Sequence, residues 1–513
     1  MGILREGQLI NIPVQKAKEI DLMSLKQQTL TGLEWNAGAN IAKQILQFVI
    51  SVILIRLLTP KDFGLIGMII VFTGFAGLFG ELGFGAALIQ RKEIEERHLS
   101  SIFWLNIATG LILTGIMLAI APVITTFYNE PRLKLLTMVL SAAFFIGSFS
   151  IVQKIILIRS MNFRMLAIIE TLTMSIAGIL AIILAFLGFG VWTLVWQAIV
   201  SAIIGAILLW VLSDWRPSLR FNKNAAKELL GFSGNLLGFD VFNYWVRNVD
   251  DLLIGKVIGS SGLGIYTKAY SIMLMPLRQV SSAVGQVMFP ALSKIQDDKL
   301  RVKHLYLSSI SIIALITFPM MMGLLIVADS FVLVLFGQKW VNLIPILKVF
   351  CLLGMLQSIG TTEGWIYNSQ GRTDWQFLWG IASGSLLIIS IIIGIIIGSV
   401  LSVAICYTIG EIILTYHGFA IPGKLINMTF RDVVHSVSGV FGCAVLMAGG
   451  VYLLGVILPS AWPHWANLVV QVSFGIIIYI VLIHFFKLKS YVEAKELFLE
   501  QWQTHFPRKN SIC

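Results

Sequence analysis

Residues 237–255 read LGFDVFNYWVRNVDDLLIG, an apolar stretch that nevertheless carries four charged side chains. If the stretch is helical, its polar residues share one face: Asp240, Asn243, Tyr244, Arg247, Asp250 and Asp251. A charged side chain at the centre of a bilayer costs about 2.5–3.5 kcal/mol on insertion scales. A membrane helix with this face must therefore turn it towards protein or water and away from lipid.

The chain around this stretch has the composition of a polytopic membrane protein. Hydrophobic residues make up 57% of its 513 residues and charged residues only 12%, against about 25% charged in soluble domains. Apolar runs long enough to span a bilayer occur at roughly 34–58, 62–88, 100–127, 133–157, 166–188, 190–213, 229–257, 263–291, 304–328, 341–366, 375–397, 400–421, 432–457 and 464–487. We therefore expect an all-α fold with about 14 transmembrane helices.

The loops between these runs alternate in charge. The face that carries both termini holds 26 Lys and Arg residues, and the opposite face holds 5. Because positive residues stay on the cytoplasmic side, we expect both termini in the cytoplasm, and the net charge of +11 reflects topology rather than nucleic acid binding. No segment between spans is longer than about 214–228, so a soluble catalytic or nucleotide-binding domain has no room.

Three other spans also carry polar faces. The first span has Asn36, Asn40, Lys43, Gln44, Gln47 and Ser51 at helical spacing, the second has Glu81, and the eighth has Lys268, Ser271, Met275, Arg278 and Ser282. These helices and the seventh are the first two of each six-helix half. Sliding residues 31–90 against 231–290 also superposes three glycine pairs: Gly38 with Gly238, Gly64 with Gly264, and Gly85 with Gly285. The pattern suggests duplicated halves around a central site.

The polar residues allow two interpretations. Lys43, Lys268 and Arg278 have no acidic residue near them in the sequence, which favours a water-filled cavity. Arg247 lies three and four residues from Asp250 and Asp251, so these could instead pair and fix helix packing. For Asp250 and Asp251 a role in helix packing is favoured. For Arg56 and Lys256 we favour side chains that extend to the membrane interface from the ends of their helices. For Glu81 and Glu363 a packing hydrogen bond and a role in proton or cation binding remain equally open.

Several blocks resemble one family. ELGFGAALIQRKEIEERHLSSIFWLN (81–106), NVDDLLIGKVIGSSGLGIYTKAYSI (248–272), PLRQVSSAVGQVMFPALSKIQDD (276–298), GQKW (337–340) and NSQGRTDW (368–375) are similar to the polysaccharide flippases. The chain resembles the Wzx and teichuronic-acid-exporter branch of the multidrug/oligosaccharidyl-lipid/polysaccharide exporter superfamily. The resemblance implies two pseudo-symmetric six-helix lobes plus two C-terminal helices. It also implies alternating access around a cavity lined by helices 1, 2, 7 and 8.

The domains expected on this plan are a cytoplasmic tail (1–30), an N-lobe (31–213), a cytoplasmic linker (214–228), a C-lobe (229–421), two further helices (422–487) and a second cytoplasmic tail (488–513). The implied substrate is an undecaprenyl-diphosphate-linked oligosaccharide, moved across the bacterial inner membrane. Other polysaccharide-pathway proteins, a polymerase and glycosyltransferases, are the implied partners.

The cavity residues fit an anionic head group. Lys43, Arg247, Lys268 and Arg278 would supply charge-assisted donors to a diphosphate, and Asn40, Gln44, Gln47, Asn243 and Tyr244 would complete the polar lining. Flipping breaks no bond, so neither a catalytic residue nor a bound cofactor or metal is expected. In the absence of an ATPase domain, an H⁺ or Na⁺ gradient is the expected energy source, with Glu81, Asp240 or Glu363 binding the ion.

Two other functions compete with this prediction. A drug/cation antiporter of the same superfamily would favour acidic residues in its cavity, so the four cations argue against it. A membrane polymerase or ligase acting on lipid-linked glycans would need a large external loop and paired external carboxylates, and the predicted outward loops are short.

Overall fold

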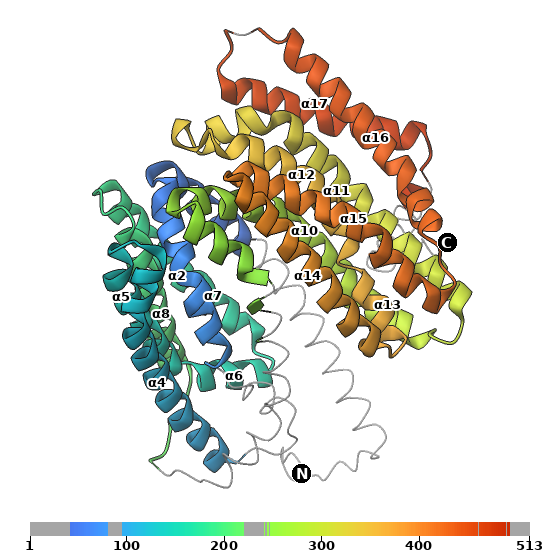
Figure 1. The fold of residues 1–513 in the computed structure, drawn as a ribbon. Coiled ribbons are helices and arrows are strands. Elements are labelled where there is room, and N and C mark those ends of the chain that lie inside the picture. Colours follow the sequence, from blue (N-terminus) through green and yellow to red (C-terminus); the bar gives the residue numbers. More distant parts are fainter. Residues whose placement is uncertain are drawn as a thin grey trace, which may run out of the picture. The chain divides into compact units, whose positions relative to one another are not determined.

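The computed structural model describes residues 42–80, 95–219, 241, 244–245, 247–459, 461–488 and 490–492. Over these residues the secondary structure is helical, and no strand occurs in them. Figure 1 shows the helices and their labels. The chain forms two compact units, each with its own internal contacts. Unit 1 comprises Met1–Leu57 and Phe72–Val241, and unit 2 comprises Leu58–Val71 and Phe242–Cys513.

Unit 1 is a bundle that contains a helix at 42–57 and five helices that follow later in the chain. These are α4 (Glu96–Tyr128), α5 (Arg132–Ser148), α6 (Ile151–Arg159), α7 (Phe163–Phe186) and α8 (Trp192–Leu212). Within it α4 packs on α5, α5 on α8, and α7 on α8. Asn162 starts α7 by accepting a hydrogen bond from the Met165 N–H, 3.2 Å away, which satisfies one of the free donors of a helix N-terminus.

The predicted span at 133–157 is a broken helix. Helices α5 and α6 meet at an angle of 45°, just after Gly147 and Ser148. Glycine–serine pairs are a recurrent site of helix kinks. The indole N–H of Trp210 on α8 donates to the carbonyl oxygen of Phe149 at 2.8 Å and so satisfies a backbone acceptor at the break.

Unit 2 contains the start of α2 (Pro60–Leu78), a helix over 247–257, and the remaining helices of the chain. They are α10 (Ser260–Lys294), α11 (Lys299–Leu335), η1 (Gln338–Trp340), α12 (Leu343–Gly360), α13 (Glu363–Ser369), α14 (Thr373–Ile397), α15 (Val400–Gly423), η2 (Lys424–Ile426), α16 (Phe430–Ile457) and α17 (His464–Phe485). Helix α10 packs on α11, α12 and α13, and α15 packs on α12 and α14. Helices α16 and α17 pack on α11 (Figure 1).

Two glycines bring α2 and α10 into backbone contact inside unit 2. A Cβ atom added at Gly64 would overlap the carbonyl oxygen of Ser260, and one added at Gly264 would overlap that of Pro60 and lie 2.9 Å from the Gly64 nitrogen. The side-chain hydrogen of glycine is what permits this approach. The contact explains why Leu58–Val71 belongs to unit 2, although the sequence assigns it to the N-lobe (31–213).

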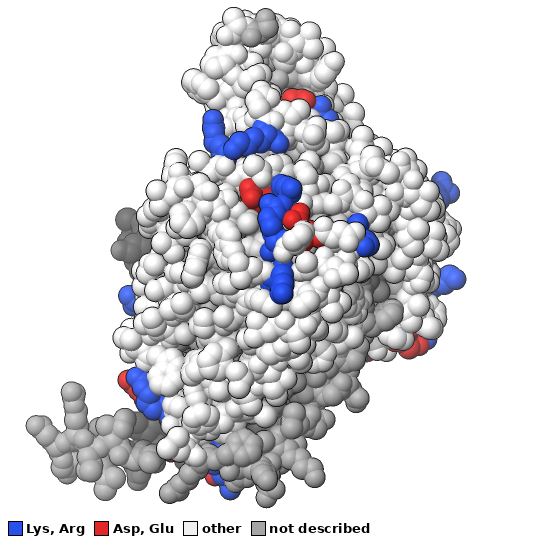
Figure 2. Space-filling model, turned by 60° about the vertical axis from the view of Figure 1, so that its left-hand side comes forward, with Lys and Arg blue, Asp and Glu red and all other residues white. Residues whose placement is uncertain are grey.

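The surface has the character expected of a membrane protein. Large apolar side chains such as Val211, Ile396 and Ile457 are 70%, 78% and 77% exposed, which a water-soluble protein avoids at this density. Most of the face in Figure 2 lacks Lys, Arg, Asp and Glu. Among the described residues, ten helices are long and apolar enough to cross a membrane, or eleven if the bent α5–α6 pair is one span.

This is a multi-pass membrane protein, and the number of 14 spans stays a prediction. Three more predicted spans coincide with helices that are not among these ten or eleven. The helices at 42–57 and 247–257 cover only part of their predicted spans, and α10 is long enough but too polar. The predicted linker lies largely outside the described residues, since 220–228 are not among them.

Candidate functional site

Helix α10 presents two contrasting faces. Tyr266, Ala269, Met273 and Leu277 are buried within unit 2 at helical spacing. The predicted polar stripe lies on the other side, where Ser271, Met275, Arg278 and Ser282 are exposed and Lys268 is half-buried. The stripe is therefore an unpacked face. Arg278 makes no ion pair or hydrogen bond with any described residue, so its charge is available to a ligand.

Lys268 lies at the buried end of the stripe. Its Nζ atom is 4.1 Å from the centroid of the Phe63 ring on α2. A cation over an aromatic face gains about 0.5–2 kcal/mol. No carboxylate of the described residues pairs with it. The aromatic ring thus orients the ammonium group and leaves its hydrogen-bond donors free of an acidic partner.

Tyr244, predicted to line the cavity, contacts the backbone of α2. Its hydroxyl lies 2.8 Å from the carbonyl oxygen of Val71 and 3.2 Å from that of Ile70, and donates to these acceptors. Arg247 is exposed. Within the described part of the chain it makes no ion pair with Asp250 or Asp251, so the pairing expected from their spacing is wrong.

Asp250 takes a partner from another helix. The Tyr266 hydroxyl on α10 donates to its Oδ2 atom at 3.0 Å, and the Asp251 backbone N–H donates to its Oδ1 atom at 2.9 Å. The contact thus agrees with the expectation that Asp250 serves helix packing. Its partner is the phenol of Tyr266 and not the guanidinium of Arg247. A tyrosine hydroxyl satisfies a partly buried carboxylate without bringing a second charge out of water.

A second polar cluster continues from the same side of α10. The ring of Tyr270 is stacked with that of Tyr266, with centroids 6.4 Å apart, and its hydroxyl lies 3.5 Å from Gln357 Oε1. The Gln357 amide then donates to Glu411 Oε1 at 3.2 Å and lies 3.5 Å from the Tyr407 hydroxyl. We call these residues, with Asp250, the unit 2 polar network. It joins the helix at 247–257, α10, α12 and α15.

Glu363 stands at the first position of α13, beside this network. Its carboxylate packs against Gly418 of α15, where an added Cβ would overlap Oε1 and lie 2.8 Å from Oε2. The sequence singled out Glu363 but not Gln357, Tyr407 or Glu411. The signal for the last two was their spacing of four residues in an otherwise apolar helix.

Unit 1 holds a separate charged cluster around Glu170. The Lys43 ammonium group, on the helix at 42–57, forms an ion pair with Glu170 Oε2 on α7. Lys154 on α6 approaches the other carboxylate oxygen, Oε1, at 3.6 Å. Lys43 therefore has an acidic partner, 127 residues away in the chain, which no local sequence pattern could reveal. We call Lys43, Lys154 and Glu170 the unit 1 triad.

The remaining predicted residues divide into two groups. Gln44 is half-buried and Gln47 is exposed on the helix that carries Lys43. Asn40, Glu81, Asp240 and Asn243 lie outside the described residues. No three His, Cys, Asp or Glu side chains of the described residues converge so as to hold a metal ion.

Comparison with known proteins supplies the family. Residues 53–345 match the family model described as "Polysaccharide biosynthesis protein". The chain belongs to this family. It is 30% identical over 488 residues to the teichuronic acid biosynthesis protein TuaB of Bacillus subtilis (strain 168), a match that covers 93% of this chain and 99% of TuaB. The resemblance drawn from the sequence blocks is confirmed.

Two further similarities agree with membership of the polysaccharide biosynthesis family. The chain is 26% identical over 443 residues to the lipopolysaccharide biosynthesis protein WzxC of Escherichia coli (strain K12), covering 85% of this chain and 89% of WzxC. Its structure is similar to the lipid II flippase MurJ in an inward closed conformation, with a TM-score of 0.70 at 17% identity, covering 88% of this chain and 98% of that one. The latter likeness confirms the predicted fold class.

Proposed function

We propose that the protein translocates a lipid-linked oligosaccharide bearing a phosphate group, such as an undecaprenyl-diphosphate-linked repeat unit, from one membrane leaflet to the other by alternating access. The proposal draws on the names of its relatives, which act in teichuronic acid and lipopolysaccharide biosynthesis. The observation that carries it is the exposed face of α10, with Lys268 and Arg278 free of acidic partners among the described residues. The similarity to TuaB and WzxC, together with the likeness of the fold to the lipid II flippase MurJ, supports a transporter rather than an enzyme.

The chemistry of that face suits an anionic head group. Lys268 and Arg278 are ten residues apart, which at 1.5 Å per residue spreads positive charge along about 15 Å of α10. A guanidinium offers a phosphate two parallel hydrogen bonds, and an ammonium acts as a point charge. A cationic drug would be repelled by the same face, so an antiporter for such drugs fits less well.

Translocation needs an energy source only where net transport runs uphill. An H⁺ or Na⁺ gradient is our proposal, acting on the carboxylates of unit 2. Glu363 and Glu411 are the described residues that we propose bind the ion, because both carboxylates lie inside the helix bundle, against Gly418 and Gln357, and neither forms an ion pair with a described cation. A bound cation would supply that missing counter-charge. A gradient that still drives transport after Glu363→Gln and Glu411→Gln together would exclude this role.

We propose a bacterial inner membrane location, because the relatives of the chain are bacterial. The excess of Lys and Arg on the face carrying the termini supports placing both termini in the cytoplasm. The enzymes that build and polymerise the same oligosaccharide are the proposed partners, since they must supply the lipid-linked substrate on one side and consume it on the other.

The test is leaflet exchange in liposomes. Full-length protein is reconstituted with a fluorescent undecaprenyl-diphosphate oligosaccharide, and the accessible fraction of the lipid is followed over time. We expect the exchange to require the protein. Its rate should fall at least tenfold in Lys268→Ala and in Arg278→Ala, because each substitution removes one charge-assisted contact worth about 1.4 kcal/mol. Lys348→Ala is the matched control, because Lys348 pairs with Asp329 at 2.6 Å. Exchange that survives both cavity substitutions would refute the role of the α10 face.

A further inference from the structure

One carboxylate in unit 1 serves two ammonium groups. Each oxygen of Glu170 faces a different lysine, Lys43 at Oε2 and Lys154 at Oε1. The side chains come from three helices and remain 32%, 50% and 34% exposed for Lys43, Lys154 and Glu170. The unit 1 triad therefore carries a net charge of one positive unit and stays accessible to a ligand.

The position of the triad along its helices can be derived from a second contact. A Cβ atom added at Gly178 of α7 would meet the side chain of Ile50, 3.1 Å from Cγ1. Ile50 follows Lys43 by seven residues and Gly178 follows Glu170 by eight. The two helices thus run parallel, and the triad lies about 11 Å along the axis from that crossing.

That end of the helices is the cytoplasmic one in the topology derived from the charges. Lys154 lies at the end of the predicted span at 133–157, and Arg159 and Arg164 follow it in the positively charged connection to the span at 166–188. Such connections stay in the cytoplasm. A substrate made in the cytoplasm and carried on a lipid would meet the triad before it moves across the membrane.

A two-lysine cluster of this kind matches the chemistry of a phosphate group. Lysine ammonium groups are compact, strongly hydrated charges that bind phosphate. A phosphate group brings more negative charge and more acceptor oxygens than a carboxylate. It can therefore take both lysines from a carboxylate that holds them.

We propose that Glu170 is a resident counter-anion, which holds Lys43 and Lys154 together in the empty site and is displaced by the phosphate moiety of the lipid-linked substrate. The inference rests on the proposed function for its substrate class. Glu170 sets how tightly the head group is held and how readily it leaves, because the carboxylate competes for the same two donors. It is a specificity-determining residue rather than a catalytic one.

Binding to full-length protein in lipid nanodiscs tests this directly. The probes are inorganic pyrophosphate and farnesyl diphosphate, titrated by calorimetry. We expect Glu170→Gln, which removes the competing charge at nearly constant shape, to lower the Kd for both probes about tenfold, equivalent to about 1.4 kcal/mol. Tightening for farnesyl diphosphate alone would mean that the lipid-borne diphosphate is the form recognised. Unchanged or weaker binding of both probes would overturn the proposal.

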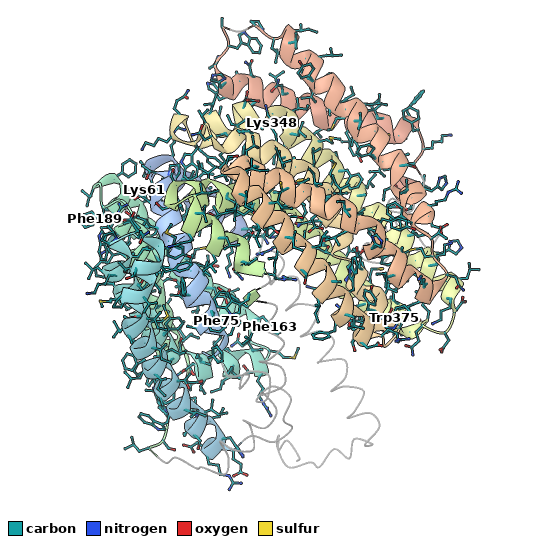
Figure 3. The ribbon with its side chains drawn as sticks, in the orientation of Figure 1. Lys61, Phe75, Phe163, Phe189, Lys348 and Trp375 are labelled. Carbon is teal, nitrogen blue, oxygen red and sulfur yellow. The ribbon has the colours of Figure 1, made fainter. Side chains whose placement is uncertain are left out.

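Two controls separate this role from a merely structural one. Asp329→Asn removes the carboxylate of the single-lysine pair with Lys348 on α12 (labelled in Figure 3) and should leave diphosphate binding unchanged. Glu170→Asp keeps the charge and should stay within about threefold of the wild type. Tightening by Asp329→Asn equal to that of Glu170→Gln would show a general charge effect and would overturn the inference.

Leaflet exchange distinguishes failure of this inference from failure of the proposed function. In liposomes Glu170→Gln should reach its maximal rate at a lower lipid concentration but exchange more slowly at saturation, because release is impeded. Wild-type exchange with unaltered binding in Glu170→Gln refutes the counter-anion and keeps the flippase. Tighter pyrophosphate binding in a protein that moves no glycan lipid keeps the anion site and refutes the function.

Discussion

Replacing Gly64 by alanine should separate α2 from α10, because the two backbones touch at this point. An added Cβ would overlap the Ser260 carbonyl group and lie 3.0 Å from the Gly264 nitrogen. Both neighbours are backbone atoms on a regular helix, so no side-chain rotation can relieve the overlap. The whole of one helix must shift.

The magnitude follows from two opposing terms. Alanine in a helix interior is favoured over glycine by about 1 kcal/mol. Forcing a methyl group into a packed contact costs about 1–3 kcal/mol when side chains can adjust, and an overlap with backbone lies at or above the upper end. We therefore expect Gly64→Ala to destabilise the protein by about 2 kcal/mol net or more. The apparent Tm should fall by several degrees.

The same helix supplies the matched control. Gly77 also lies on α2, but a Cβ there meets nothing within 4 Å, so Gly77→Ala should raise the Tm or leave it unchanged. Gly67 is intermediate, since its added Cβ would lie 3.2 Å from the flexible Leu263 side chain. Thermal unfolding of the three purified variants in one detergent gives the series. Equal stability of Gly64→Ala and Gly77→Ala would refute the backbone contact between α2 and α10.

Three further predictions concern polar contacts. Tyr244→Phe removes the hydrogen bonds to the Ile70 and Val71 carbonyl oxygens and should cost about 0.5–1.5 kcal/mol in thermal unfolding; an unchanged Tm would contradict the contact. Tyr266→Phe leaves Asp250 without its phenol donor, so we expect the free energy of unfolding to fall by about 1–3 kcal/mol. Adding Asp250→Asn to this variant should recover part of the loss, and no recovery would count against the Tyr266–Asp250 hydrogen bond. Lys303→Gln breaks the 2.7 Å ion pair between Lys303 on α11 and Asp432 on α16. The free energy of unfolding should fall by less than about 1 kcal/mol, and the loss should shrink in 1 M salt. A larger loss that does not depend on salt would mean that the lysine acts through packing.

The fold could be predicted from the sequence wherever an apolar run of spanning length stands between polar connections. The predicted spans at 166–188 and 375–397 correspond to α7 (Phe163–Phe186) and α14 (Thr373–Ile397). The break inside the predicted span at 133–157 leaves no mark in the hydropathy pattern, although Gly147 precedes it. Hydropathy averages over a break, because both halves remain apolar, whereas the angle depends on a local backbone change.

The candidate site could be predicted only where its residues share a helix. The stripe on α10 was visible because five polar or flexible residues recur at helical spacing. The unit 1 triad was not, since Lys43 and Glu170 meet across 127 residues. The alignment of Gly64 with Gly264 in the sequence suggests a duplication. In the structure these two glycines also touch one another, a contact that no comparison of a sequence with itself could establish.

The polar residues of unit 2 fall into two classes, and their energetics assign them different roles. Asp250, Gln357 and Glu411 are partly buried and find partners within the protein, which satisfies the hydrogen-bonding groups that burial removes from water. Arg278 finds none among the described residues and lies on an exposed face. An arginine cannot shed its proton to avoid this cost, and facing lipid would cost several kcal/mol. Its face must therefore be hydrated or occupied by an anion. The paired residues can hold the fold or an ion, whereas the unpaired cations are the part of unit 2 that a passing phosphate group can bind.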